Sequence, residues 1–409
     1  MAETKIFDPI HGFIAISPLM KRILATPEMH RLRDLKQLGA TSYVFPGATH
    51  TRLSHSIGVS YLAGKMMTSL RVNQPELMIT DRDVELTRIA ALVHDLGHGP
   101  YSHLYDDRVI ESDEPKHEER GCKMFREMVR RHGLPLEEEE VDRVTAMVNP
   151  RGEEQIHSWQ YQIVANKACQ VDVDKIDYLQ RDVYYLGLKY GGEYSRLLTE
   201  ARVCWVDVVG VGQTQEIAWP EKLQYEIFSL FATRYRLHKQ VYNHPVVKAH
   251  EYCLVEILRE LRRKGTPFLQ LTDSAVLCPL HTNCEPMQQA IASRTIPKLI
   301  GETIKRGPPP LGSPTPRTVL DLIIDEVKIG FGGGVNPLEQ VSYYGPESNA
   351  AAGWCARRLD PSKASFCIPA LHQETLLRLY TTDTSPEGIA HAKEHWNIMK
   401  SANALMDSI

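Results

Sequence analysis

The chain has 409 residues, enough for two or three domain-sized units or for one large helical domain with a smaller appendage. Hydrophobic residues make up 43% of it and charged residues 24%, as is typical of globular proteins. The formal net charge of -4 argues against a broad basic surface for nucleic acid, and the absence of a long apolar run predicts no membrane-spanning helix.

The compartment can be read only coarsely from the sequence. The opening residues MAETKIFDPIHG lack the basic and apolar regions of a signal peptide. The 8 cysteines are scattered without a CxxC pair, which favours reduced thiols. We therefore expect an intracellular protein, with cytoplasm and nucleus left undecided.

The first part of the chain is expected to be largely helical. Residues 1–20 read as an extended arm with turns at Asp8-Pro9 and His11-Gly12, and residues 17–38 as helical with a break near Pro27. Apolar residues recur at spacings of three and four over 52–70 and 82–96, which predicts two amphipathic helices. Further helices are predicted at 117–132, 137–148, 158–167 and 174–186.

The later segments alternate between strand and helix signals. Residues 200–219 predict a small β-hairpin around Gly-Val-Gly, and helices return over 220–264. A proline-rich loop at 307–316 precedes predicted strands at 318–329 and 337–344, and 361–380 and 384–407 are expected to be helical in part. The predicted fold is mainly α, with a helical core over 1–306 and a C-terminal α+β lobe over 307–409.

Histidines and carboxylates gather in a few segments of the predicted core. The most informative segment is VHDLGHGPYSH, where three histidines, two glycines and a proline follow an apolar helical run. The other segments are HTRLSHS, KHEERG and VDVDKIDYLQRD. The candidate residues in these four segments are His50, His55, His94, Asp95, His98, His103, His117, Glu118, Asp172, Asp174, Asp177 and Asp182.

The adjacent pair His94-Asp95 suggests a metal site. Neighbouring side chains on a helix point about 100° apart, so both can bind one ion only if other helices supply further ligands. His55 and Asp174 are good candidates for these ligands. Imidazole and carboxylate together suit a transition metal or zinc better than calcium. A single buried histidine is more often a hydrogen-bonded core residue, but the HDLGHGPYSH string favours the metal interpretation.

The chain resembles the family of HD-domain dNTP triphosphohydrolases whose vertebrate members also carry a sterile-alpha-motif domain. The resemblance is carried by KQLGATSYVFPGATHTRLSHSIGVSYLAGKM, IAALVHDLGHGPYSHLYDD, VDVDKIDYLQRDVYYLG and TRYRLHKQVYNHP. It extends from about Ile6 to Tyr380, and no sterile-alpha-motif domain is expected before it. The resemblance implies an HD-domain helical core that cuts dNTPs into deoxynucleoside and triphosphate.

Site roles follow from the resemblance for the matching positions. It implies one transition metal (Fe, Mn or Zn) held by His55, His94, Asp95 and Asp174, and Mg²⁺ accompanying the nucleotide. The catalytic set is His103 with Asp106 behind it, surrounded by His98, His117 and Glu118. The substrate-binding set is Arg52, Lys175 and Arg234 at the triphosphate, Gln37, Leu38 and Asp182 at the 3′-hydroxyl, Tyr178 against the 2′ carbon, and His238 and Tyr242 near the base.

General chemistry agrees with these roles. A triphosphate carries about four negative charges, so several cationic side chains must converge on it. A metal ion can polarise a phosphoryl oxygen, and a histidine can supply the proton that the leaving 5′-oxygen needs. Without the motif context, the arginines and the lysine would be read as solvated or ion-paired surface residues.

The resemblance also implies activation by GTP and dNTP effectors and assembly into a dimer or tetramer. Positions matching effector contacts are Arg33, Arg196, Lys222, His244, Arg294 and Lys298. The sequence departs from the family at Phe7, Ala25, His30 and Pro245. Ala25 replaces an aspartate that reads guanine, and an alanine accepts no hydrogen bond from the base, so GTP-specific activation is in doubt.

Two other functions remain open from the sequence. An HD-domain phosphodiesterase or alarmone hydrolase would keep the metal site, but the set Gln37, Tyr178 and Asp182 disfavours it. A nucleic-acid-binding protein with a vestigial HD site is disfavoured by the acidic net charge and by the complete ligand set. Nucleic acid is therefore a possible but disfavoured partner, and a membrane is not expected.

Overall fold

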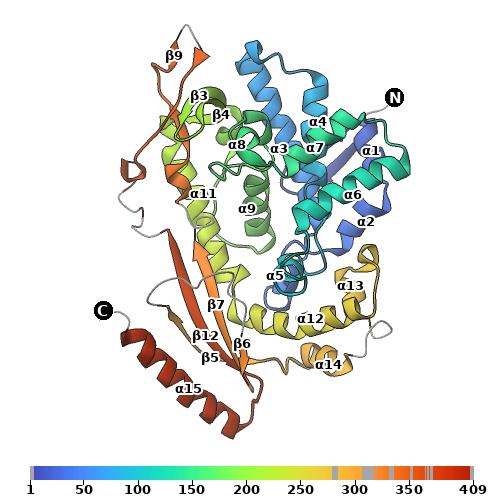
Figure 1. Cartoon of the computed structure of the whole chain (residues 1–409), viewed down its shortest axis with the longest axis vertical. Coiled ribbons are helices and arrows are strands. Elements are labelled where there is room, and N and C mark those ends of the chain that lie inside the picture. The colour runs from blue at the N-terminus through green and yellow to red at the C-terminus, as the bar shows by residue number, and fades with distance from the viewer. Residues whose placement is uncertain are drawn as a thin grey trace.

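The fold was analysed in a computed structural model, which describes residues 4–278, 284–305, 317–319, 321–330, 336–350, 353–363, 365, 368 and 372–405. Figure 1 shows a helical body in the upper part of the molecule and a sheet with one long helix below it. The mainly α prediction with a C-terminal α+β region is confirmed. No helix in the described part of the chain is long and apolar enough to cross a membrane.

The N-terminal arm and the helical body follow one another along the chain. Their elements are β1 (Thr4–Asp8), β2 (Gly12–Ile16), α1 (Pro18–Leu24), α2 (Pro27–Arg31), η1 (Leu32–Asp34), η2 (Gly39–Tyr43), α3 (Arg52–Asn73), η3 (Pro75–Leu77), α4 (Asp81–Val93), α5 (His103–Arg108), α6 (His117–His132), α7 (Glu138–Val148), α8 (Gly152–Ile156), η4 (Trp159–Tyr161), α9 (Val173–Tyr185) and α10 (Ser195–Thr199).

A hairpin and further helices lead into the C-terminal sheet. The elements are β3 (Arg202–Val208), β4 (Gly212–Pro220), η5 (Glu221–Leu223), α11 (Gln224–Leu237), the π-helix η6 (His238–Tyr242), α12 (Pro245–Arg263), η7 (Phe268–Gln270), α13 (Asp273–Val276), α14 (Glu285–Ser293), β5 (Lys298–Ile304), β6 (Arg317–Val319), β7 (Leu322–Gly330), η9 (Pro337–Glu339), β8 (Ser342–Tyr344), β9 (Asn349–Ala350), β10 (Gly353–Trp354), β11 (Arg357–Arg358), η10 (Pro361–Lys363), β12 (Gln373–Thr381) and α15 (Pro386–Leu405).

The helical body is organised around α3. This helix packs against α4 and α9, and buried residues on all three contribute to one large hydrophobic core. The helix ends are fixed locally: Thr80 and Asp83 form a capping box at α4, and the Asp172 side chain accepts a hydrogen bond from the Lys175 backbone N–H at the start of α9. The Asp172 cap fixes the end of α9 that carries Asp174, whereas the capping box of α4 lies at the opposite end of that helix from His94.

Two glycines allow close approaches around α3 and α6. A Cβ atom on Gly58 would lie 2.1 Å from Asp177 Oδ1, so only glycine lets α9 come this near to α3. A Cβ atom on Gly97 would lie 2.1 Å from the backbone oxygen of His117, at the first residue of α6. The second contact explains why the HDLGHG turn needs glycine: it brings the turn directly against α6.

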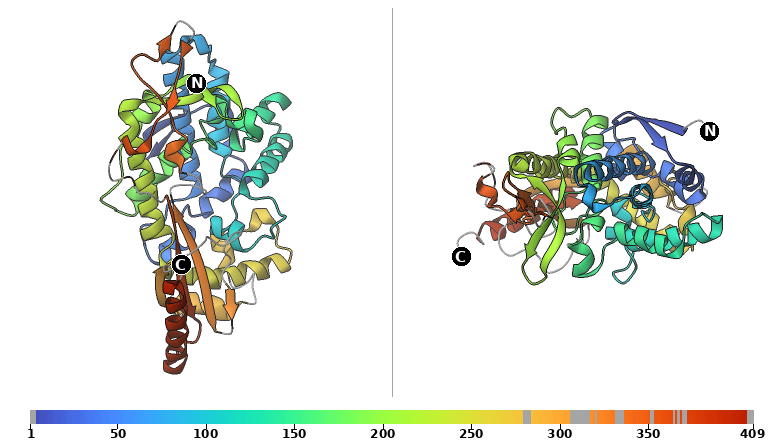
Figure 2. Two further views of the ribbon diagram at one scale, coloured as in Figure 1. Left: turned by 60° about the vertical axis from the view of Figure 1, so that its left-hand side comes forward. Right: turned by 90° about the horizontal axis from the view of Figure 1, so that it is seen from above.

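The C-terminal sheet has the strand order β5-β12-β7-β6, and the pairs in it are antiparallel. Alternate residues face opposite sides: Leu322 and Leu379 pack with Trp396 of α15, whereas Ile323 and Tyr380 pack with Ala249 of α12. The left view of Figure 2 shows from another side that the sheet and α15 extend below the helical body. The sheet thus lies between α15 and the body.

Three element predictions need correction. Residues 158–167 form only the short η4, and 337–344 contain η9 before the short strand β8. Within 361–380, η10 is the only helical segment among the residues that the structure describes, and 373–381 form the strand β12, whose pairing with β5 and β7 outweighs local preference. The predicted loop at 307–316 lies outside the described residues. The division at 306/307 stays a prediction, although β5 lies before it and pairs with β12 after it.

Candidate active site

Three distant helices bring His55, His94 and Asp174 together. Their ligand atoms all lie within 4.8 Å of one another. Asp174 Oδ1 is 2.9 Å from His55 Nε2 and 3.5 Å from His94 Nε2. These distances bring together the residues that the sequence analysis combined into one site, on α3, at the end of α4 and on α9.

The His94 ring has one nitrogen committed and one available. Nδ1 donates a hydrogen bond to the Ala91 carbonyl, 2.7 Å away, which leaves a lone pair on Nε2. Nε2 is buried and has no hydrogen-bond partner among the described residues. A buried imidazole lone pair directed toward carboxylates fits a metal ligand well.

Asp95 lies between two groups of side chains. Its Oδ2 accepts a hydrogen bond of 2.5 Å from Arg52 Nη1. Its Oδ1 lies 3.4 Å from His94 Nε2 and 3.2 Å from His98 Nε2. Asp95 is therefore close enough to His94 to share an ion with it, while Arg52 fixes its orientation.

Behind the ligands lies a buried ionic network that the sequence analysis did not assign to the site. Asp177 Oδ2 lies 2.8 Å from His55 Nδ1, and Asp177 Oδ1 lies 2.6 Å from Nε2 of His11 in the N-terminal arm. Arg181 donates hydrogen bonds to Asp177 and to Asp8. The N-terminal arm thus reaches Asp177 and Arg181, which lie behind the predicted metal ligand His55. The clue in the sequence was the spacing of Asp174, Asp177 and Arg181 along one helix.

The electrostatics of the ligand group favour a cation. Burial lowers the pKa of His55, but hydrogen bonds to Asp174 and Asp177 outweigh this effect and raise it to about 10. Burial also opposes ionisation of Asp174, yet His55 and His94 hold its pKa well below the ordinary value. Without a metal, a proton on His55 offsets part of the carboxylate charge, and metal binding would release that proton.

A second histidine cluster adjoins the first. His98, His103 and His117 have ligand-type nitrogens within 4.8 Å of one another, and the rings of His98 and His117 stack at 3.8 Å between centroids. Asp106 accepts a 2.6 Å hydrogen bond from His117 Nδ1 and a second one from Arg120. Glu118 Oε1 lies 3.5 Å from His117 Nε2, near the edge of the cluster.

His103 lies at the rim of this cluster, exposed to the open cavity on one side. The protein around its other sides, together with His117 and Arg52, lowers the pKa of His103 to about 4. Burial raises the pKa of Asp106, but His117 and Arg120 bring it down to about 2. At neutral pH, His103 is therefore neutral and Asp106 is ionised.

A cavity of about 550 Å³ opens beside the two clusters, within the size range of small-molecule sites. Nine of the predicted residues line it: Gln37, Leu38, Arg52, His103, Tyr178, Asp182, Arg234, His238 and Tyr242. Lys175 is not among the lining residues, and its Nζ pairs with Asp172 at 3.1 Å. Arg234 donates a hydrogen bond to the Gly330 carbonyl at the end of β7.

The C-terminal sheet contributes to the cavity wall, which the sequence analysis did not foresee. Residues 325–328 of β7 line the cavity together with Lys248 and Glu251 of α12. Asp325 accepts a 2.8 Å hydrogen bond from Tyr252 and lies 3.5 Å from Arg108. No local pattern in β7 announces this role, because it arises from the packing of the sheet against α12.

One end of the cavity is lined by hydroxyl and carboxylate groups. Asp182 Oδ2 accepts a 2.5 Å hydrogen bond from Tyr242, and Asp182 Oδ1 lies 2.7 Å from Nε2 of the buried His50. Tyr242 and His238 belong to the π-helix η6, and such helices often occur at functional sites. Tyr178 reaches the same cavity from α9.

Comparison with known proteins decides the family. The HD domain family matches residues 52–182. Deoxynucleoside triphosphate triphosphohydrolase SAMHD1 of Bos taurus is 33% identical, over 96% of this chain and 77% of the relative. The Homo sapiens protein of the same name is 32% identical, over 96% of this chain and 72% of the relative. A Dictyostelium discoideum homologue is 39% identical, over 66% of this chain and 50% of the relative.

The chain belongs to the SAMHD1 family. An HD domain implies a divalent metal at the active site, and the group of His55, His94 and Asp174 fits one. In this SAMHD1-family chain, the HD match begins at Arg52 and ends at Asp182, so it includes the predicted metal ligands.

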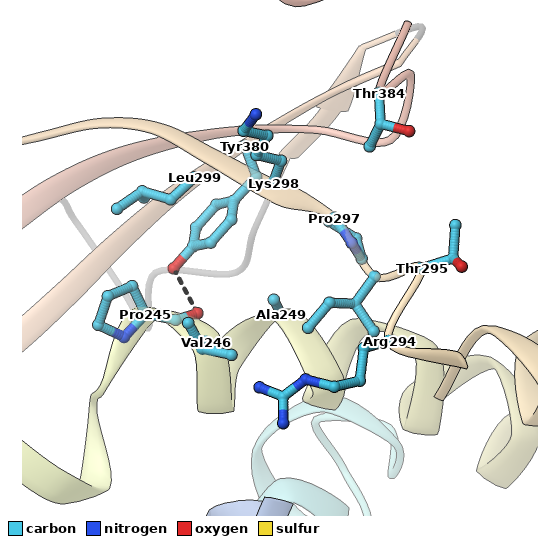
Figure 3. Close-up of a pocket in the computed structure, with 11 residues that line it drawn as sticks. Pro245, Val246, Ala249, Arg294, Thr295, Pro297, Lys298, Leu299, Tyr380 and Thr384 are labelled. Carbon is cyan, nitrogen blue, oxygen red and sulfur yellow. Dashed lines mark hydrogen bonds between the residues drawn. The ribbon is translucent and has the colours of Figure 1, made fainter. Parts of the chain in front are cut away.

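The residues expected to contact effectors lie in separate places on this SAMHD1-family chain. Arg294 and Lys298 line a second cavity of about 550 Å³ between α12 and β5, and Figure 3 shows their charged ends pointing apart. Lys222 lines a third cavity near Trp354, and both Lys222 and Arg196 pair with Glu200.

The remaining effector candidates lie elsewhere. His244 caps α12 and packs edge-on against Phe45, and Arg33 is exposed on η1. The departing residues Phe7, Ala25 and His30 are also exposed. Pro245, the fourth departure, lines the cavity between α12 and β5. One chain alone therefore does not bring the expected effector residues into a single site.

Proposed function

We propose that this protein hydrolyses dNTPs at the α-phosphate and releases a deoxynucleoside and inorganic triphosphate. The observation that carries the proposal is the buried, unpartnered Nε2 of His94 among His55, Asp95 and Asp174, next to the cavity that His103 and Arg52 line. The Bos taurus and Homo sapiens relatives are deoxynucleoside triphosphate triphosphohydrolases, which disfavours the phosphodiesterase and the nucleic-acid alternatives.

The residues suited to hold the metal are His55, His94, Asp95 and Asp174. Iron, manganese and zinc all accept such ligands. When bound, the ion would polarise a phosphoryl oxygen and make hydroxide available near neutral pH. Asp177 would keep the His55 ring oriented through Nδ1, as carboxylates commonly do for metal-bound histidines.

The chemistry at the α-phosphate needs a proton donor for the leaving 5′-oxygen. His103 lines the cavity, and Asp106 orients the neighbouring His117. The low pKa of His103 describes the protein without substrate. A triphosphate next to this ring would raise the pKa, so we expect His103 to take up a proton when substrate binds and to donate it as the P–O5′ bond breaks.

The rest of the cavity would select and orient the nucleotide. Arg52 would contact the phosphates, with Mg²⁺ accompanying them. Lys175 and Arg234 would join it after exchanging their present partners, Asp172 and the Gly330 carbonyl. Tyr178 would pack against the 2′ carbon and exclude a ribose. Gln37, Leu38 and Asp182 would surround the 3′-hydroxyl, with His238 and Tyr242 near the base.

Regulation by nucleotides belongs to the same proposal. Arg33, Arg196, Lys222, His244, Arg294 and Lys298 would bind GTP or dNTP effectors. Because these residues are spread over one chain, effectors would bind between chains and favour a dimer or tetramer. We further propose that residues 1–306 form the catalytic core with its N-terminal arm and that 307–409 form a C-terminal lobe, which contributes β7 to the cavity wall.

The test is product analysis in ¹⁸O-labelled water. Metal-loaded protein is incubated with each dNTP, with and without GTP, and the products are identified by mass spectrometry. Attack at the α-phosphate with cleavage of the P–O5′ bond places one ¹⁸O in the triphosphate and none in the deoxynucleoside. Release of pyrophosphate with a deoxynucleoside monophosphate, or no turnover together with tight RNA binding, would overturn the proposal.

A further inference from the structure

His50 is a buried histidine that the proposed mechanism does not use. It precedes α3, its side chain is inaccessible to solvent, and it is not among the residues that line the cavity. Its ring stacks on Tyr185 with 4.6 Å between centroids. Its ring reaches the cavity wall through Asp182, because its Nε2 lies 2.7 Å from Asp182 Oδ1. Its backbone carbonyl accepts a 3.0 Å hydrogen bond from the N–H of Gln37, another lining residue, but a side-chain substitution leaves this contact in place.

The contacts of His50 define its hydrogen-bonding role. Nδ1 is buried without a hydrogen-bond partner among the described residues, so the proton of a neutral ring is best placed on Nε2. Nε2–H then donates to Asp182 Oδ1, while the Tyr242 hydroxyl donates to Oδ2 from the other side. The carboxylate is held by one donor on each oxygen, and its two remaining acceptor directions are free for a ligand hydroxyl.

We propose that His50 is a positioning residue that sets the selectivity for a 3′-hydroxyl, acting through Asp182. This inference rests on the proposed function, in which Asp182 faces the sugar. A carboxylate held by two donors cannot rotate away from the cavity. Its strength as an acceptor for the 3′-hydroxyl then depends on the geometry that His50 and Tyr242 impose together.

The inference is tested by comparing each dNTP with its 2′,3′-dideoxy counterpart. His50→Phe keeps a ring against Tyr185 but removes the donor, whereas His50→Gln keeps an N–H near the position of Nε2. We expect His50→Phe to lower kcat/KM for the dNTP about tenfold and to change that for the dideoxy substrate less than twofold. His50→Gln should restore most of the discrimination.

Equal losses for both substrates in His50→Phe, or no loss for either, would overturn the role of His50. If His50→Phe fails to fold, Tyr242→Phe removes the second donor and should show the same selective loss. Failure of the proposed function is distinguishable, because wild type would then release no triphosphate from any dNTP. In that case binding decides, through the Kd of the dideoxy nucleotide divided by the Kd of the matching dNTP. A ratio that is smaller in His50→Phe than in wild type supports the inference, and an unchanged ratio overturns it.

Discussion

Each imidazole at the proposed metal site is oriented through the nitrogen that faces away from the ligand group. His94 uses Nδ1 to bond the Ala91 carbonyl, and His55 uses Nδ1 to bond Asp177. In both rings this leaves Nε2 facing Asp174. The tautomers needed for metal binding are therefore set by neighbours that are not ligands themselves.

Replacing Asp177 should weaken metal binding without removing a ligand. In Asp177→Asn, the His55 ring loses its charged acceptor, and Arg181 and His11 lose a charged partner. We expect metal affinity to fall about 10- to 100-fold. The measurement is competition with a chelator of known affinity, monitored by elemental analysis of the protein.

A matched control for this prediction is Asp142→Asn, which removes an exposed carboxylate paired with Arg126. Exposed pairs of this kind contribute little, so metal affinity should not change. Wild-type metal affinity in folded Asp177→Asn would show that the ligand His55 needs no support from α9.

At the scale of elements, the short helix α13 holds two segments that line the cavity. Asp273 is buried, and its carboxylate accepts hydrogen bonds from the backbone N–H groups of Lys36 and Tyr101, at 2.9 and 2.7 Å. These residues precede Gln37 and Ser102-His103. Tyr101 and Ser102 have φ angles of 57° and 62°, a backbone region that is costly for residues other than glycine. α13 therefore helps to hold a strained segment next to His103, the proposed catalytic histidine.

Asp273 should also make stability depend on pH. Burial raises the pKa of Asp273 to about 6, although the two backbone donors act in the opposite direction. A carboxyl whose pKa is higher in the folded state stabilises the fold at low pH, and this contribution is lost as pH rises from about 4 through about 6. The loss corresponds to about 3 kcal/mol at most.

Urea unfolding of wild type and Asp273→Asn between pH 4.5 and 7.5 measures this effect. Because asparagine does not ionise, the free energy of unfolding of the variant relative to wild type should rise with pH over this window. A difference that does not vary with pH would show that Asp273 titrates normally in the folded protein.

The contact between the HDLGHG turn and α6 gives a further prediction. In Gly97→Ala, the new Cβ atom would collide with the His117 backbone oxygen and with Gly121, which lie 2.1 and 2.4 Å away. The turn must then move, which separates His98 from His117. We expect a loss of about 1–3 kcal/mol in stability and about 100-fold in kcat.

The comparison variant is Gly121→Ala on the facing helix. Its Cβ atom would approach no closer than 3.1 Å, to the Gly97 nitrogen, so the effect should be milder. Thermal unfolding and triphosphate release check both variants. A Gly97→Ala variant with the wild-type rate would mean that the two histidines need not be held together.

At the scale of the whole molecule, the cavity depends on both ends of the chain. The N-terminal arm reaches the ligand supports through His11 and Asp8, and β7 of the C-terminal sheet forms part of the cavity wall. Assembly of several chains and activation by nucleotides would act on the molecule as a whole. The exposed residues Ala25, His30 and Phe7 are positions at which the sequence departs from the family in this respect.

Ala25 gives a prediction about activation. A carboxylate at this position could accept two hydrogen bonds from a guanine base, and alanine cannot. We expect GTP to activate wild type no better than other nucleoside triphosphates, and Ala25→Asp to lower the GTP concentration for half-maximal activation about tenfold. The rate of triphosphate release at increasing GTP concentration measures activation, and sedimentation velocity under the same conditions measures assembly. Strong, guanine-specific activation of wild type would show that other residues read the base.

The sequence was sufficient for the helices with strong periodicity and for the grouping of three of the predicted metal ligands in space. His55, His94 and Asp174 stand out because apolar helical runs place them at helix ends or on one helix face. The strand β12 was missed because its pairing with β5 and β7 depends on residues 43 to 83 positions away. Asp177 was a candidate without an assigned role, and His11 and the β7 wall were missed, for the same reason: their roles exist only after distant segments pack together.

In the proposed function, the HD residues hold one catalytic metal ion per chain. The most direct measurement is titration of metal-stripped protein with Mn²⁺ while triphosphate release from a dNTP is followed. We expect no release without metal, a linear rise with added Mn²⁺ and saturation near one equivalent per chain, with no such response in His94→Gln. Full activity of the stripped protein, or the same titration curve for His94→Gln, would contradict it.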